Sequence, residues 1–333
     1  MRQKNYPIIL LTVLLVLFQS CKQKTTEPLT SYIESNYTAT DARGVKVSLE
    51  QPAQRVVVLF EAFVDAVFML GAQDRLVGVP SQVYLTPDSY DFFSTLSPAF
   101  AAKEIATPSF NGRSVNMETL MALQPDLVVT FSQDLQMIEQ MEGMGIKVFS
   151  MIGSDIDTTL KEFEGLGNLL GKSERAKMIT GYMRGEIKKM NELVPEKKKT
   201  AYYVWSRGRV LSTSGKGTLM DAAIRLAGVE NACPLEMEAP NIGVELLYQW
   251  NPDLMILWNT PVSDVYELKE LAKLPAVVNK QVFEMKPIFL FDPHTVKQVL
   301  FSKQVKQWAY PNLYTKETFD KEVEEAKKLL YNL

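Results

Sequence analysis

Aromatic side chains recur at the ends of the strands that the sequence predicts, together with a few ionisable groups. The candidate ligand-binding set is Phe60, Glu61, Tyr84, Phe110, Arg113, Phe131, Trp205, Arg207, Trp258 and His294. Such rings stack on a flat macrocycle or a catecholate, and guanidinium groups pair with carboxylates through two N–H donors. Because the binding crevice of an open α/β sheet lies at the carboxyl ends of its strands, these residues predict a ligand site there. The alternative is that each ring only caps its sheet as part of the core.

Histidine chemistry is restricted, because His294 is the single histidine of the chain. Its imidazole could complete an open coordination position on iron, cobalt or nickel, and the alternative is a hydrogen-bonded structural residue. Zinc sites built on several histidines are excluded, and no Ser-His-Asp triad is spaced around this residue. We expect no intrinsic cofactor and no direct metal site unless His294 provides one.

Enzyme motifs are weak in this sequence. Residues 214–218 (SGKGT) resemble a phosphate-binding loop, but Gly217 stands where that loop requires Ser or Thr. Catalysis by carboxylates alone, as in a glycosidase, stays open as an alternative. We therefore expect a protein that is not an enzyme.

The elements that would position these residues read as an α/β fold. Residues 37–49 predict a hairpin with its turn at 41–44, and residues 55–60 (RVVVLF) form the continuous apolar run of a buried parallel strand. A helix over 63–70 and a short strand over 76–79 follow. Residues 80–114 are rich in turn formers and aromatics, so we expect a loop-rich segment that is functional or acts as a lid.

An internal repeat is the strongest pattern in the chain. Residues 117–131 (METLMALQPDLVVTF) and 244–258 (VELLYQWNPDLMILW) match at an offset of 127 positions. Each copy predicts a short helix, a Pro-Asp turn and a buried strand. A second pair of Asp-Ala steps, at 65–66 and 221–222, is expected to start a helix in each half. The distance from the Asp-Ala pair to the repeat copy is longer in the first half than in the second. The first half therefore contains an insertion about as long as residues 80–114.

A long amphipathic helix is predicted between the two copies, over residues 173–194, with Ser173 as its N-cap. Strand–helix–strand patterns lie on both sides of it. We interpret residues 173–195 as a strut between an N-terminal lobe, 37–172, and a C-terminal lobe, 196–333. The alternative is one more helix within a single domain.

The N-terminus predicts export and anchoring. Residues 1–20 have the basic start and short apolar run of a signal peptide, and Cys21 follows in a segment that resembles a bacterial lipobox. Lipidation of Cys21 would leave residues 21–36 as a polar tether. The alternative is a plain signal peptide with an incidental cysteine. The net charge of −3 provides no basic field for nucleic acid.

The order of these features resembles the substrate-binding proteins of ABC importers for ferric siderophores, haem and cobalamin. The likeness extends from RVVVLF and the two Pro-Asp copies to Trp308-Ala-Tyr-Pro311 near the end. It implies two Rossmann-like lobes joined by one long helix, with the ligand in a cleft between them. It also implies that this protein binds and delivers a chelated metal complex without chemistry, as a monomer anchored in a bacterial cell envelope and facing the periplasm.

The resemblance assigns a second role to two acidic residues. Glu118 and Glu245 match the glutamates with which members of this family dock on arginines of the permease dimer, which works with its ATPase. The alternative is that both are ordinary first-turn acids favoured by the helix dipole. A lipoprotein that captures its ligand without an ABC partner is the second non-enzyme alternative. Siderophore, haem and corrinoid all remain open as the ligand.

Overall fold

The computed structural model describes residues 37–333, apart from 113, 132–133, 152–154 and 206–208. The expected signal, lipidation site Cys21 and tether lie outside the described residues, as do Arg113 and Arg207. Residues 35–333 form one compact unit. Within the described part of the chain, no helix combines the length and apolar character that a membrane crossing needs.

A five-stranded parallel sheet organises the first half of this unit, in the order β5-β4-β3-β6-β7. Its strands are β3 Val56–Val58, β4 Leu76–Pro80, β5 Ala106–Ser109, β6 Leu127–Phe131 and β7 Val148–Met151. The helices around it are α1 Glu61–Met69, α2 Pro87–Leu96, α3 Pro98–Ala101, α4 Met117–Ala122, α5 Leu135–Gly143 and α6 Ile156–Leu169. The central strand β3 is fully buried, as its apolar run predicts.

The predicted hairpin is present as β1 Tyr37–Thr40 and β2 Lys46–Leu49, which pair in antiparallel register. Asp41 fixes the turn, because its Oδ1 accepts hydrogen bonds from the backbone N–H groups of Arg43 and Val45. Its Oδ2 accepts from the Ser150 hydroxyl at 2.9 Å, which joins the turn to β7.

The expectation of a loop-rich segment over residues 80–114 is wrong. This segment contains α2, α3 and the edge strand β5. Pro87 and Pro98 occupy the first turns of the two helices, where a missing N–H costs nothing. Two of its aromatics belong to the core: Phe93 and Phe100 are buried and pack on Phe68 at centroid distances of 4.4 and 5.7 Å.

A four-stranded parallel sheet organises the second half, in the order β11-β10-β8-β9. Its strands are β8 Thr200–Val204, β9 Glu230–Asn231, β10 Leu254–Leu257 and β11 Val282–Glu284. The neighbouring helices are α8 Leu219–Leu226, α9 Val244–Trp250, α10 Val262–Tyr266 and α11 Pro275–Val278. The prediction of an α/β fold with two parallel sheets is confirmed.

The predicted repeat is present in detail. The copies fold as α4 then β6, and as α9 then β10, and the residue before each Pro-Asp adopts a left-handed conformation: φ is 45° at Gln124 and 44° at Asn251. Asp126 accepts the backbone N–H groups of Gln54 and Arg55 just before β3, and Asp253 accepts the backbone N–H and the hydroxyl of Thr200, the first residue of β8. The prediction that both Asp-Ala pairs start a helix is only partly right, because Asp65 lies in the middle of α1 instead of at its start.

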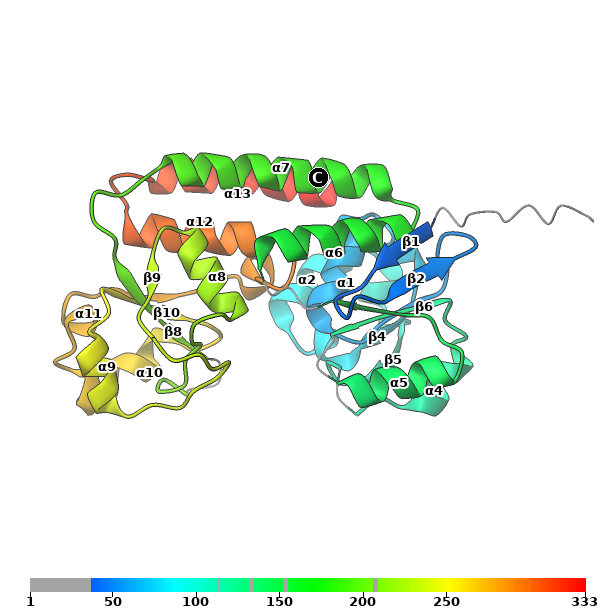
Figure 1. Cartoon of the computed structure of the whole chain (residues 1–333), viewed down its shortest axis with the longest axis horizontal. Helices are drawn as coiled ribbons and strands as arrows, with labels where there is room; N and C mark the ends of the chain where they lie inside the picture. Colours follow the sequence, from blue (N-terminus) through cyan, green and yellow to red (C-terminus); the bar gives the residue numbers. More distant parts are fainter. Residues whose placement is uncertain (1–36, 113, 132–133, 152–154, 206–208) are drawn as a thin grey trace, which may run out of the picture. The chain divides into compact units, whose positions relative to one another are not determined.

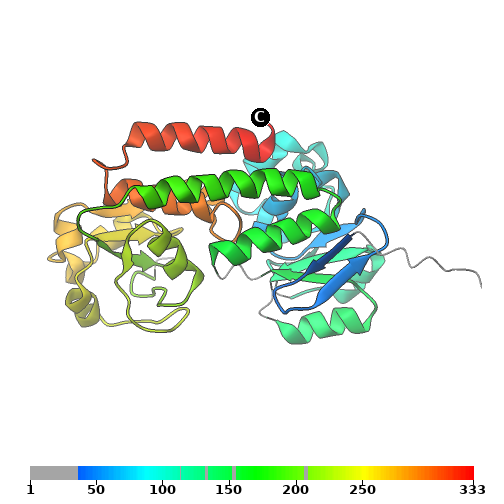
Figure 2. The same cartoon turned by 45° about the horizontal axis from the view of Figure 1, so that its top comes forward.

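Three long helices lie along one side of the two sheets (Figures 1 and 2): α7 Ser173–Glu192, α12 Gln298–Ala309 and α13 Lys316–Tyr331. The predicted amphipathic helix is α7, and its stripe residues Ala176, Ile179, Met183 and Met190 are buried. Its N-cap is Lys172 and not Ser173, whose hydroxyl donates to Asn168 instead. The residue bounds of the two lobes and of the strut stay a prediction, and α12 and α13 accompany α7 in this layer.

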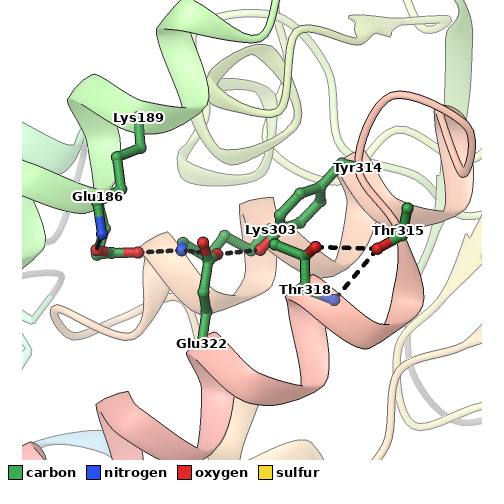
Figure 3. A network of polar contacts seen from close by, with 7 residues as sticks. All are labelled: Glu186, Lys189, Lys303, Tyr314, Thr315, Thr318 and Glu322. Atoms are coloured by element: carbon green, nitrogen blue, oxygen red, sulfur yellow. Dashed lines mark hydrogen bonds and ion pairs between the residues drawn. The ribbon is translucent and has the colours of Figure 1, made fainter.

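Buried charges hold the three helices together. Lys303 of α12 is 1% exposed and pairs with Glu186 of α7 and Glu322 of α13 (Figure 3). The Tyr314 hydroxyl donates to Glu322 at 2.5 Å. Lys306 donates to the carbonyl oxygens of Met190 and Leu193, so its ammonium lies at the C-terminal end of α7.

We expect the two repeated aspartates to be equivalent in stability as well as in position. Asp126→Ala and Asp253→Ala should each lower the free energy of unfolding by about 1–2 kcal/mol, because each removes charged acceptors from backbone N–H groups at the start of a central strand. Urea denaturation followed by circular dichroism measures this change.

The matched control is Asp320→Ala on α13, which removes an exposed pair with Lys316 and should cost at most about 0.5 kcal/mol. A loss at position 126 without a comparable loss at 253 would contradict the equivalence.

Candidate functional site

Two rings from neighbouring strands form the floor of the candidate site. Phe131 is the last residue of β6 and Phe60 follows β3, and β3 and β6 are paired in the sheet. The rings stack with centroids 5.0 Å apart and planes 18° from parallel. Both side chains are partly exposed. This pair therefore presents a flat aromatic surface at the carboxyl edge of the five-stranded sheet.

The single histidine reaches this surface from the other half of the chain. The His294 ring lies edge-on to Phe60 at 5.4 Å and to Phe131 at 6.0 Å. Asp292 orients it, since its Oδ1 lies 2.8 Å from Nδ1 and also accepts the backbone N–H of His294. Burial raises the pKa of Asp292, but His294 and Lys297 outweigh that effect and leave the pKa below its usual value. With Nδ1 held in this way, Nε2 is the nitrogen available to a ligand.

Glu61 begins α1 beside these rings. Its backbone N–H donates to Oδ1 of Asn111 at 2.8 Å, which ties the loop after β5 to the start of the helix. Its Oε1 is buried and has no hydrogen-bond partner among the described residues. Burial raises the pKa of Glu61, while the hydroxyls of Thr86 and Ser89 lower it to a smaller extent. A protonated carboxyl here can donate a hydrogen bond as well as accept one.

The two tryptophans lie at adjacent strand ends of the four-stranded sheet. Trp205 follows β8 and Trp258 follows β10, and the hydroxyl of Thr260 donates to the backbone carbonyls of both, at 3.2 and 3.1 Å. Nε1 of Trp205 is buried without a hydrogen-bond partner among the described residues. Both tryptophans are partly exposed and stand at the edge where the sequence places ligand-binding rings.

The other predicted residues are dispersed. Tyr84 belongs to a separate cluster with Tyr90 and Phe100, and burial raises its pKa to about 12. Phe110 follows β5 and is 43% exposed. Arg113 and Arg207 cannot be placed, because both lie outside the described residues.

Glu118 and Glu245 occupy equivalent positions. Each is the second residue of its helix, α4 or α9, and each is exposed. Figures 1 and 2 draw both helices on the side of their sheets away from α7. The internal repeat thus places one acidic side chain in each half at the start of an equivalent helix.

Pockets and metal clusters do not identify another site in the described chain. A surface hollow of about 630 Å³ lies against α8 and β9, and none of the predicted ligand-binding residues lines it. Among the described residues there is no group of three or more His, Cys, Asp or Glu side chains suited to a metal ion.

Sequence reasoning missed the residues that orient this site. Asn111 and Asp292 hold Glu61 and His294 by hydrogen bonds, and Thr260 joins the two tryptophan strands. For Asp292 the sequence contains a signal, because an Asp side chain often accepts the backbone N–H of the residue two positions later, which here is His294. The contacts of Asn111 with Glu61 and of Thr260 with Trp205 join residues 50 and 55 positions apart, which only the tertiary structure reveals.

The chain matches a known protein family. Residues 56–288, well over half of the chain, match the family described as periplasmic binding protein. The chain belongs to the periplasmic binding protein family. The resemblance to substrate-binding proteins that the sequence suggested is therefore confirmed.

Individual relatives in this family are distant. The uncharacterised ABC transporter substrate-binding lipoprotein YvrC of Bacillus subtilis is 22% identical over 261 residues, which cover 75% of this chain and 78% of YvrC. A vitamin B12-binding protein of Vibrio campbellii is 21% identical, with coverage of 70% and 82%. A cobalamin-binding protein of Halobacterium salinarum is 24% identical, and the match spans 66% of this chain but only 58% of that protein.

Solved structures of periplasmic binding proteins share the fold. The CeuE protein of Helicobacter pylori, with Ni(II) bound, has a TM-score of 0.78 at 21% identity and covers 89% of this chain and 96% of its own. The vitamin B12-binding protein BtuF of Vibrio cholerae has a TM-score of 0.64 at 17% identity, with coverage of 83% and 99%. These likenesses establish the two-lobed architecture.

We expect Glu61 to make stability depend on pH. Its folded-state pKa lies above the ordinary value of 4.5, so the unfolded chain releases this proton first as pH rises. Stability should therefore fall between 4.5 and the raised pKa, and Glu61→Gln removes this loss. The unfolding free energy of the variant minus that of the wild type should increase above pH 4.5 and then level off in urea titrations.

Glu174→Gln, at an exposed first-turn position of α7, gives the baseline for this substitution. A Glu61→Gln difference that follows this baseline or decreases with pH would contradict the assignment.

Proposed function

We propose that this protein captures a chelated metal complex (a ferric siderophore, haem or a corrinoid) and delivers it to an ABC permease without chemistry. The observation that carries the proposal is the meeting of Phe60, Phe131 and His294 at the carboxyl edge of the first sheet. Membership of the periplasmic binding protein family supports it. So do a cobalamin-binding and a vitamin B12-binding relative, and one similar solved structure with Ni(II) bound.

The chemistry of the site favours a large flat or aromatic ligand. Stacked rings offer apolar area with little entropy loss on binding, and Trp205 and Trp258 can add to that surface. His294 could supply one nitrogen to an open position on the metal, while the complex brings the remaining ligands. Arg113 and Arg207 are the proposed partners for carboxylates or propionates.

We propose further that the protein is a monomer held at the cell envelope through lipid on Cys21 and facing the periplasm. A lipoprotein among its relatives supports this. Its partners would then be the permease dimer and its ATPase, docked through Glu118 and Glu245. Charge pairs at the rim of an interface mainly set its register and encounter rate.

Tryptophan fluorescence tests the binding function directly. The protein from residue 22 onward is titrated with haemin, cyanocobalamin, ferric catecholate and hydroxamate siderophores, and nickel-histidine. We expect saturable one-to-one quenching by one class, because Trp205 and Trp258 stand at the proposed site. Flat curves for folded protein across the panel would reject a metal-complex ligand, and turnover of any added compound would reject a role without chemistry.

The aromatic floor should carry much of the affinity for the quenching ligand. Phe60→Ala and Phe131→Ala should each weaken binding by about tenfold, the loss expected for one stacked ring. Tyr266→Ala, an exposed aromatic on α10, is the control and should leave the dissociation constant unchanged. Equal affinities for all three variants would place the ligand elsewhere.

The two glutamates should act in docking and not in ligand binding. The double variant Glu118→Ala, Glu245→Ala should keep the ligand affinity but lose stimulation of the ATPase of the cognate transporter in proteoliposomes. The control is Glu174→Ala, Glu317→Ala, which removes exposed first-turn acids from α7 and α13. Normal stimulation by the Glu118, Glu245 variant would reject the docking role and favour a lipoprotein without an ABC partner.

A further inference from the structure

A buried ion pair joins the two halves of the chain directly behind the candidate site. Nζ of Lys297 lies 2.5 Å from Oδ2 of Asp65, and the two residues are 1% and 4% exposed. Asp65 belongs to α1, beside the five-stranded sheet, whereas Lys297 immediately precedes α12. Lys297 also donates to the backbone carbonyl of Phe289. The pair therefore connects segments that are 232 positions apart in the chain (297 minus 65).

The end of α13 completes the junction. The Tyr331 hydroxyl donates to Oδ1 of Asp65 at 2.7 Å, while Oδ2 has the ion pair with Lys297 and no hydrogen-bond partner among the described residues. Phe92 of α2 packs against Phe289 at 4.7 Å and against Tyr331 at 4.6 Å, and these rings keep water from the charges. Attraction between charges is much stronger in such surroundings than at the surface.

The same two segments carry the residues of the site. Asp65 lies one helical turn after Glu61 on α1, and Lys297 lies three residues after His294. Asp292, which orients the His294 ring, precedes Lys297 in the same loop, and Lys297 contributes to the lowered pKa of Asp292. Any displacement of the 292–297 loop relative to α1 would thus move His294 away from Phe60.

Energetics separate this role from simple stabilisation. A buried ion pair gives little net stability compared with apolar side chains of similar size, because desolvation offsets the attraction. It does fix geometry, since either charge alone in this position is strongly unfavourable. An apolar contact would allow the 292–297 loop to slide over α1. The ion pair allows only one position of this loop relative to α1.

We propose that Asp65 and Lys297 form a positioning latch that holds the 292–297 loop against α1 and so sets the His294 ring on Phe60 and Phe131. The two residues act through His294 and do not touch the ligand. For the binding role this inference rests on the proposed function, but the position of His294 can be tested without any ligand.

Nuclear magnetic resonance of the single histidine is the decisive measurement. The ring currents of Phe60 and Phe131 displace the His294 ring protons from the positions of an isolated histidine. In the double variant Asp65→Asn, Lys297→Met, which leaves no unpaired charge, we expect these resonances to move toward the isolated values. Affinity for the ligand identified by quenching should fall roughly tenfold, as preorganisation is lost.

The control variant removes another buried pair of α12. Glu186→Gln, Lys303→Met removes the ion pair between α12 and α7 but leaves Lys306 on the carbonyls of Met190 and Leu193, and it should alter thermal stability while leaving the His294 resonances in place. If the Asp65, Lys297 variant is unfolded, Tyr331→Phe decides the matter, because it removes only the hydroxyl donor to Asp65 and should displace the same resonances by less.

Two outcomes would overturn the latch: wild-type His294 resonances at isolated-histidine positions, or unchanged resonances in a folded latch variant. Failure of the wild-type protein to bind any member of the ligand panel would overturn the proposed function instead. The resonance comparison would still decide the latch in that case.

Discussion

The structure depends on the burial of three lysines along α12 and the residue before it. A buried ammonium is tolerated only where carboxylates or carbonyl oxygens replace its water, and each lysine finds a different set. Lys297 meets Asp65, Lys303 meets Glu186 and Glu322, and Lys306 meets the last carbonyls of α7. Burial lowers the pKa of Lys306, whose partners are neutral. Because these partners lie on α1, α7 and α13, α12 fits in one place only.

This constraint reaches the candidate site through short stretches of chain. The helix layer fixes α12, Lys297 fixes the loop before it, and that loop carries Asp292 and His294. On the opposite side, α1 starts at Glu61, directly after Phe60. With the proposed latch, the candidate site, whose residues come from both halves of the chain, takes its geometry from buried charges. Relatives in the periplasmic binding protein family share the architecture in which such a site is formed.

Prediction from sequence succeeded where local chemistry decided the structure. The Pro-Asp copies fold alike because proline ends each helix and the aspartate accepts a backbone N–H at the start of the strand paired beside it in the sheet. It failed for residues 80–114, where prolines and aromatics suggested a loop. Pro87 and Pro98 begin helices instead, and Phe93 and Phe100 fill the core. The number of turn formers could not distinguish a proline that ends a helix from one that starts it.

By itself, the sequence determined the alternation of strands and helices, the internal repeat, the long helix and the aromatic strand ends, because apolar periodicity and turn residues act over a few positions. The tertiary structure alone decided which of these residues meet. Phe60, Phe131 and His294 converge, while Tyr84 turns to a separate cluster. It also decided that Lys297, Lys303 and Lys306 are buried. The sequence does not predict this, because lysine side chains are mostly exposed to solvent in folded proteins. Each of the three has a partner more than a hundred positions away (Asp65, Glu186 and Met190, respectively), and only folding brings such groups together.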